Sequence, residues 1–160
     1  MTELEKGPKG RRRGRGARER ILSASQQLFR EQGINRTGMD QLCAAAQVSK
    51  RTAYQHFTGK DELVAEYLRR FDPSVLSGVF DRTDLTPRER LLAAFEVPAT
   101  GLCPFIAAAV EIPDPGHPAR VYARAYKRAF AARLTDTARE AGATNPEQLG
   151  EQLALLLDGS

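Results

Sequence analysis

Two helix-start signals, at Thr37 and Ser49, lie only 12 residues apart, which leaves room for one short helix and a tight turn between them. Thr37 is followed three residues later by Asp40, in the manner of a capping box. Ser49 is a favourable N-cap residue for the next helix. Between the two signals the apolar residues recur at spacings of three and four, as one face of a helix requires. They are Met39, Leu42, Cys43 and Ala46.

The residues that follow Ser49 are predicted to form the second helix of a pair. Ala53 and Phe57 fall on one face of that helix, and the basic and polar residues fall elsewhere, where we expect them to be mostly exposed. Thr58, with Asp61 three residues later, then starts a further helix. Two short helices joined by a tight turn, the second with basic and hydroxyl side chains at its beginning, form the helix-turn-helix arrangement of DNA-binding proteins.

This segment resembles the DNA-binding domain of the tetracycline-repressor (TetR) family, whose members carry a pattern close to T-x-x-x-I-A-x-x-A-G-V-S-K-x-T-x-Y-x-H-F-x-x-K-x-x-L. The matches run from Thr37 to Leu63, and together with the preceding ILSASQQLFREQG they cover roughly residues 18 to 68. Two positions depart from the pattern. Gln47 stands where the family usually has Gly, and a positive φ there would cost a non-Gly residue on the order of 1 kcal/mol. Cys43 stands where Ala is common, a change that a small buried site accommodates.

The resemblance implies an all-α protein in which an N-terminal three-helix domain with the helix-turn-helix is joined by a fourth helix to a helical bundle. We assign residues 1–16 to a disordered basic arm, residues 17–62 to the DNA-binding domain, and residues 63–160 to an effector-binding and dimerisation domain. Gly33 and Gly142 are placed to end helices. Helices are predicted over Ala17–Gln32, Asp61–Phe71, Pro104–Ile112 and Ala119–Glu140, and from Pro87 (with Thr86 as N-cap) and Pro146 onward. The helix over Pro104–Ile112 is almost wholly apolar and is expected to be buried.

The C-terminal half resembles the family less specifically. Its run GLCPFIAAAVEIPDPGHPARVYARAYKRAFAARL is similar to one that recurs in a TetR subgroup, except that Leu102 separates Gly101 from Cys103. In the family the last two helices build a four-helix bundle across a two-fold axis. This chain stops at Gly159-Ser160, after the first of those two helices, so we expect either a truncated C-terminus or an abbreviated dimer interface.

Charge is divided unequally along the chain. Residues 1–60 contain 13 Lys and Arg against 5 Asp and Glu, whereas residues 61–160 contain 11 against 15. The basic first part alone is therefore expected to meet a polyanion. There is no run of 18 apolar residues and no apolar segment behind the basic N-terminus, so neither a membrane span nor a secretory signal is predicted. Two cysteines without ligand spacing predict a cytoplasmic protein with no metal, cofactor or disulfide framework.

A recognition helix that enters the major groove by its first turn would contact base edges with the residues directly after Ser49. These residues are Lys50, Arg51 and Thr52, with Gln55 as a weaker candidate for adenine. The resemblance, together with the free N–H groups of a helix N-terminus, assigns phosphate contacts to Tyr54, His56, Lys60 and Thr37. The basic cluster that includes Arg11, Arg12 and Arg13 is expected to act as an arm on phosphates or in a minor groove.

The mostly apolar C-terminal half is expected to bind a small apolar or amphipathic effector. The candidate lining residues are Phe105, Ile106, Ala109, Glu111, Tyr122 and Tyr126. The chain is therefore predicted to be a homodimeric regulator, most simply a repressor, that binds a pseudo-palindromic DNA operator and is released by the effector. Two alternatives remain open: a redox-sensing regulator that uses Cys103, and a small thiol enzyme in which Cys103 lies near Glu111 and His117. No catalytic residue is assigned, and His117 is expected to be a loop or interface residue rather than a metal ligand.

Overall fold

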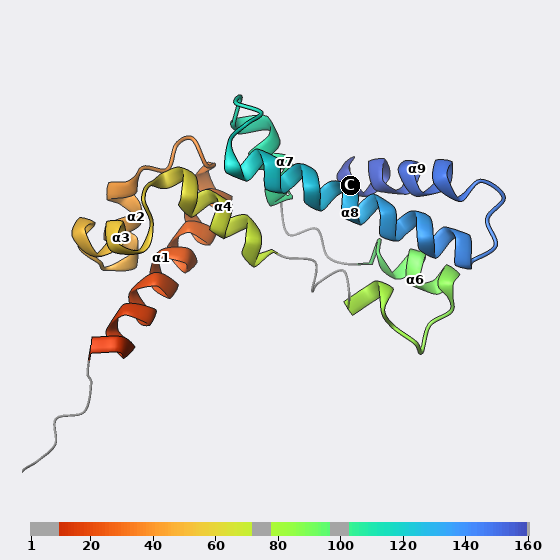
Figure 1. Ribbon diagram of the computed structural model, residues 1–160, viewed down its shortest axis with the longest axis horizontal. Helices are drawn as coiled ribbons and strands as arrows, with labels where there is room; N and C mark the ends of the chain where they lie inside the picture. The colour runs from red at the N-terminus through yellow and green to blue at the C-terminus, as the bar shows by residue number, and fades with distance from the viewer. Residues whose placement is uncertain (1–9, 72–77, 97–102, 160) are drawn as a thin grey trace, which may run out of the picture. The chain divides into compact units, whose positions relative to one another are not determined.

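The computed structural model describes the backbone of residues 10–71, 78–96 and 103–159, and the side chains in these ranges from residue 16 to residue 158. Every regular element in these ranges is an α-helix, which confirms the prediction of an all-α protein (Figure 1). The chain divides into two compact units, Met1–Tyr67 and Leu68–Ser160. No helix in the described ranges is long and apolar enough to cross a membrane.

The first unit is built around the inner face of its first helix. It contains α1 (Gly10–Gln32), α2 (Met39–Ala46), α3 (Lys50–His56) and most of α4 (Lys60–Arg70). The expected boundary at residue 62 and the observed one at residue 67 both fall inside α4. The fully buried side chains of this unit include Ile21, Leu22, Leu42, Ala53, Phe57 and Leu63. Burial of these side chains holds the short α2 and α3 in place, because helices of seven or eight residues are not stable alone.

The start of α1 differs from the prediction. The helix begins at Gly10, seven residues before the expected Ala17, so residues 10–16 are helical. The prediction of a disordered arm over residues 1–16 is therefore wrong for that part, and residues 1–9 lie outside the described residues. The reason is that extending an existing helix is far easier than nucleating one. The arginines of residues 10–16 favour the helix, and its three glycines oppose it.

The turn between α2 and α3 has the geometry that the sequence predicted for Gln47. Its φ of 53° and ψ of 48° lie in the left-handed region. The Gln47 N–H donates to the carbonyl of Ala44 at 3.1 Å, and the Val48 N–H donates to the carbonyl of Cys43 at 3.0 Å. These two bonds form a Schellman motif, which satisfies carbonyls at the end of α2 and turns the chain sharply into α3.

The start of α2 corrects the prediction for Thr37. The N-cap residue is Gly38, and no side chain caps the helix. Thr37 is fully buried, and its hydroxyl donates to the carbonyl of Gly33 at 2.8 Å while it accepts from the Gln32 amide at 3.0 Å. Thr37 thus closes the turn after α1 instead of capping α2. A spacing of three residues to Asp40 could not distinguish these two uses of a threonine hydroxyl.

The second unit contains two long helices that run side by side, joined by a short turn (Figure 1). This unit includes α6 (Pro87–Ala93), α7 (Pro104–Glu111), α8 (Pro118–Glu140) and α9 (Pro146–Gly159). As predicted, Thr86 caps α6, here in a complete capping box with Glu89, and Gly142 follows α8 at a φ of 80°. One buried cluster of this unit consists of Phe80, Leu91, Ala94, Phe130, Leu134 and Ala138.

Close packing of α8 against α9 depends on a glycine. Gly150 is buried in α9, and a Cβ atom added there would lie 2.8 Å from the backbone N and Cα of Thr135 in α8. Real Cβ atoms do not approach backbone atoms so closely. The two helices can therefore meet at this distance only because residue 150 has no side chain.

Candidate nucleic-acid interface

The helix α3 presents one buried side and one exposed side. Ala53 is completely buried and Phe57 is 1% exposed, and together they fix the helix against the core of the first unit. The predicted DNA-contacting residues lie mainly on the other side. Lys50, Arg51, Tyr54 and Gln55 are exposed, and Thr52 and His56 are half-buried. The structure therefore brings the predicted base-reading residues together on one accessible helix face.

The first turn of α3 is held by Ser49. Its hydroxyl accepts a hydrogen bond from the Thr52 N–H at 3.1 Å and shares a second one with the Thr52 hydroxyl at 2.9 Å. This confirms the predicted N-cap. Because the cap also engages the Thr52 hydroxyl, the Thr52 side chain has a defined orientation before any DNA is bound.

Lys50, the first residue of α3, forms an ion pair with Asp40 in the first turn of α2. The Nζ atom lies 2.7 Å from Oδ1 of Asp40, and the two side chains are 63% and 75% exposed. The hydrogen bond from Lys50 to Asp40, and then the charge of that carboxylate, raise the pKa of Lys50 above its usual value. The sequence predicted only a capping role for Asp40, so this contact with the recognition helix was not expected.

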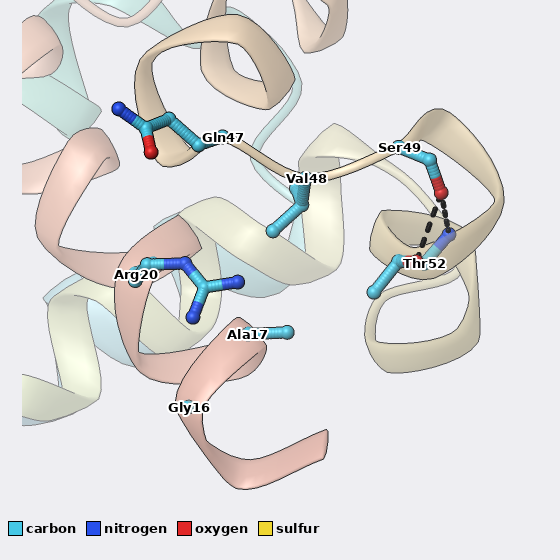
Figure 2. Close-up of a pocket in the computed structure, with 7 residues that line it drawn as sticks. All are labelled: Gly16, Ala17, Arg20, Gln47, Val48, Ser49 and Thr52. Atoms are coloured by element: carbon cyan, nitrogen blue, oxygen red, sulfur yellow. Dashed lines mark hydrogen bonds between the residues drawn. The ribbon is translucent and has the colours of Figure 1, made fainter. Parts of the chain in front are cut away.

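An open hollow lies between the first half of α1 and the α2–α3 turn (Figure 2). It has a volume of about 640 Å³ and is lined by Gly16, Ala17, Arg20, Gln47, Val48, Ser49 and Thr52. Arg20 donates from Nε to the carbonyl oxygen of Ala46 at 3.0 Å, and its guanidinium group points into the hollow (Figure 2). Guanidinium and hydroxyl groups are the usual partners of DNA phosphates.

Arg20 was not among the predicted contact residues. It lies in α1, 29 residues before Ser49, and helical periodicity identified only the apolar stripe of that helix. In the sequence, Arg20 is recognisable only as a residue beside that apolar stripe. Many arginines that contact nothing but solvent occupy the same kind of position. The contact with α2 arises from tertiary packing, which a local pattern does not contain.

Three further predicted contacts have different outcomes. Lys60 is half-buried at the first position of α4. The side chains of Arg11, Arg12 and Arg13 lie outside the described residues. The side chain of Thr37 is buried and its hydroxyl donates to the carbonyl of Gly33, so that hydroxyl is not offered to a phosphate. The phosphate contact expected at this helix N-terminus stays a prediction. The start of the fourth helix also differs in detail, because Thr58 bonds to Glu62, at 2.6 Å from its N–H, where the sequence suggested Asp61.

The predicted effector residues are partly brought together in the second unit. The rings of Phe105 and Tyr126 stack with centroids 3.7 Å apart, and Tyr122 lies 6.2 Å from Phe105. Phe105 is buried, and both tyrosines are half-buried. This aromatic cluster, Phe105, Tyr122 and Tyr126, joins α7 to α8 and combines apolar ring faces with two phenol groups.

The helix α7 is less buried than its apolar sequence predicted. Phe105 and Ala108 are buried, but Ala109 is exposed and Val110 is 76% exposed. The place of Ala109 in an effector site stays a prediction. An eight-residue helix that packs by one face leaves its other face outside, whatever its composition. Ile106 and Glu111 are half-buried and lie on the same helix as Phe105.

A second, mainly apolar hollow lies where α6 meets the α8–α9 turn. It has a volume of about 310 Å³ and is lined by Arg88, Leu91, Leu92, Phe95, Ala141, Gly142, Ala143, Leu149 and Leu153. Leu92 is 57% exposed and Phe95 is 41% exposed. This hollow involves none of the residues predicted to bind an effector.

The remaining reactive groups show no assembled site in the described ranges. Both cysteines are free thiols, Cys43 buried and Cys103 half-buried. Burial raises the pKa of the Cys43 thiol, and Asp40 raises it further, partly offset by Lys50. His117 accepts the Ala119 N–H at Nδ1 and caps α8, and no group of three potential metal ligands occurs among the described residues.

The residues of the helix-turn-helix match a known protein family. Residues 21–67 match the family described as bacterial regulatory proteins of the tetR family. The transcriptional activator FasR of Mycolicibacterium smegmatis is 38% identical over 91 residues, which are 56% of this chain and 39% of FasR. The regulator UidR of Escherichia coli is 29% identical over 85 residues, 35% of its length. The chain thus spans well under half the length of these two curated relatives.

Two crystal structures match over most of their length. A TetR-type transcriptional regulator from Streptomyces avermitilis superposes with a TM-score of 0.79 at 36% identity, covering 89% of this chain and 82% of that one. A TetR-family regulator from Streptomyces coelicolor superposes with a TM-score of 0.73 at 29% identity, covering 91% and 82%. Both units of the present chain therefore have counterparts in regulators of this family.

Proposed function

This chain belongs to the TetR family of DNA-binding transcriptional regulators, and we propose that it is a ligand-responsive repressor that binds a pseudo-palindromic operator as a homodimer. The observation that carries this proposal is the accessible face of α3, where Lys50, Arg51 and Gln55 are exposed while Ala53 and Phe57 anchor the helix. A recognition helix needs this division, because base edges are reached only by side chains free of the protein core.

Base reading is assigned to the first turn of α3. Arg51 and Lys50 match the O6 and N7 acceptors of guanine, and the Thr52 methyl group suits a thymine methyl group. Gln55, one turn further on, suits adenine. Two such helices from a homodimer would read two half-sites of an inverted repeat.

Phosphate contacts are assigned to residues around this helix. Tyr54, His56 and Lys60 retain the role that the family resemblance gives them, and Arg20 joins them because its guanidinium group points into the hollow beside Ser49. Such contacts fix the orientation of the protein on the duplex without reading its sequence. The basic excess of residues 1–60 agrees with this division of roles.

The effector is assigned to the aromatic cluster of Phe105, Tyr122 and Tyr126, with Ile106 and Glu111 beside it in sequence. Aromatic faces with a few polar groups are the usual lining of a small-molecule site. The helix α4 contains the boundary between the two units, so a ligand-dependent change in the second unit could reach α3 through it. Release of DNA then requires that the ligand discriminate between two states by a few kcal/mol, on the order of 5 for a complete switch.

The sign of regulation is tested with a reporter gene placed behind a duplex that the protein selects. We expect expression to fall when the chain is present and to recover when an effector is added. FasR bears the name of an activator, and expression that rises with this chain would contradict the repressor assignment. Sedimentation of the chain alone is expected to give a dimer, and a monomer that binds a single half-site would contradict the homodimer.

The effector location is tested with two variants of the second unit. A panel of small amphipathic compounds is screened for release of the selected duplex, and the active compound is applied to Tyr126→Ala and to Leu92→Ser. We expect Tyr126→Ala to lose the response and Leu92→Ser, in the hollow beside α6, to keep it. Loss of the response in Leu92→Ser, with the response kept in Tyr126→Ala, would instead place the effector site in that hollow.

The thiol-sensor alternative receives less support. The thiolate is the reactive form of cysteine, and the raised pKa of Cys43 disfavours it. Cys103 occupies the N-cap position of α7, where its side chain makes no capping hydrogen bond.

A further inference from the structure

The ion pair between Asp40 and Lys50 joins the two helices of the helix-turn-helix. Lys50 is the first residue of α3, and Asp40 is the second residue of α2. The carboxylate oxygen and Nζ are 2.7 Å apart although 10 residues of chain separate them. A negative charge is thus held beside the basic beginning of the recognition helix.

This pair has little to contribute to folding. Its two side chains are 75% and 63% exposed, and exposed ion pairs add little to stability. Its position matters more than its strength. A lysine in the first turn of α3 meets the positive end of that helix, whereas a carboxylate in the first turn of α2 is favoured there. Asp40 therefore gives Lys50 a defined partner that competes with any DNA phosphate.

We propose that Asp40 is a specificity-determining residue, which acts by holding Lys50 away from the phosphates of non-operator DNA. On a duplex of arbitrary sequence, a Lys50 side chain that binds a phosphate leaves the Asp40 carboxylate unpaired beside a polyanion. The favourable energy of the phosphate contact is then nearly cancelled by the cost of breaking the ion pair. On the operator, a directed contact from Lys50 to guanine acceptors offsets the loss of Asp40. This inference rests on the proposed reading of base edges by α3.

The test compares the full chain with Asp40→Asn, which keeps the shape of the side chain and removes its charge. Binding is measured against salt concentration on the duplex selected from a random pool and on a scrambled duplex of the same composition. For the variant on scrambled DNA we expect affinity to rise about two- to fivefold, the range of an exposed ion pair. We also expect the salt slope there to steepen by about one phosphate, or 0.9. The operator affinity should change less, so the specificity ratio falls.

Two controls separate a specific role from a change of net charge. Glu31→Gln removes one exposed carboxylate from the same unit, where Glu31 accepts only from Gln27 at 3.0 Å among the contacts described. It should leave the specificity ratio unchanged. In a Lys50→Gln background, Asp40→Asn should have no further effect, because the residue through which it acts is absent. Asp40→Glu, which keeps the charge, should retain most of the ratio.

Each outcome decides the inference. An equal rise on both duplexes, a matching effect of Glu31→Gln, or an effect that persists without Lys50 would each overturn it in favour of bulk charge. A wild-type chain that selects no sequence would contradict the proposed base reading and the inference together. A wild-type chain that selects an operator, with an Asp40→Asn variant of unchanged ratio, would contradict the inference alone.

Discussion

Arg20 in α1 donates a hydrogen bond from Nε to the carbonyl oxygen of Ala46, the last residue of α2, at a distance of 3.0 Å. The last carbonyls of a helix lack intrahelical partners, and the C-terminal end of a helix attracts positive charge. Arg20 therefore stabilises the end of α2 and the turn into α3. The rest of its guanidinium group points into the hollow beside Ser49 and Thr52 (Figure 2).

Substitution of Arg20 is expected to weaken DNA binding on all sequences. Arg20→Ala should lower affinity for operator and scrambled duplexes by a similar factor and reduce the salt slope by about one, because a phosphate contact carries no sequence information. The measurement is fluorescence anisotropy over a range of salt concentrations. Arg88→Ala, an equal loss of charge in the second unit, should leave the slope unchanged. A loss confined to the operator would instead make Arg20 a determinant of base reading.

Arg51 is expected to behave in the opposite way. If it contacts a guanine, Arg51→Ala should cost about 1–3 kcal/mol of binding free energy at one operator position and relax the base preference there. Lys60→Ala should lower binding about equally at every position. Sequence selection repeated with each variant measures both effects. A uniform loss with Arg51→Ala would show that this residue meets a phosphate.

Gln47 holds a left-handed conformation at the turn between α2 and α3, with a φ of 53°. Gln47→Gly should stabilise the first unit by up to about 1 kcal/mol, because glycine adopts this conformation without steric cost, although its greater freedom in the unfolded chain reduces the gain. Gln47→Val should destabilise it, since a β-branched residue is disfavoured at positive φ. Amide hydrogen exchange in α2 and α3 reports both changes. Equal protection in the two variants would contradict this reading of the turn.

Gly150 allows α8 and α9 to pack closely, so Gly150→Ala should destabilise the second unit by roughly 1–3 kcal/mol through overpacking. Thermal unfolding followed by circular dichroism measures the effect. Gly78→Ala is the matched control, because a Cβ atom there would meet nothing within 4 Å. An unchanged transition for Gly150→Ala would mean that the two helices separate without penalty.

The sequence predicted the DNA-binding unit in some detail because its signals are local. Ser49, Gln47 and the buried pair Ala53 and Phe57 each follow from a cap, a turn or a helical spacing, and the structure confirms them. Contacts between distant helices could not be predicted in this way. The bond from Arg20 to α2 depends on how α1 packs against α2, which no local spacing encodes.

The predictions from sequence were wrong where one local pattern is compatible with two different structures. Thr37 precedes a helix as an N-cap would, yet its hydroxyl bonds back to Gly33 and is buried. The apolar residues of α7 suggested a buried helix, yet Ala109 and Val110 lie outside, because composition does not show which face packs. The helix α1 also continues beyond its apolar stripe to Gly10, because an existing helix is easily extended.

The central claim is that α3 reads DNA sequence as one of a symmetric pair. The most direct test is selection from a pool of random-sequence duplexes by the full chain, with sedimentation of the recovered complex. We predict that the bound duplexes converge on an inverted repeat and that each complex contains an even number of chains. Recovered duplexes without a common sequence, bound with a strong dependence on salt alone, would contradict the claim and leave only a basic surface that attracts phosphates.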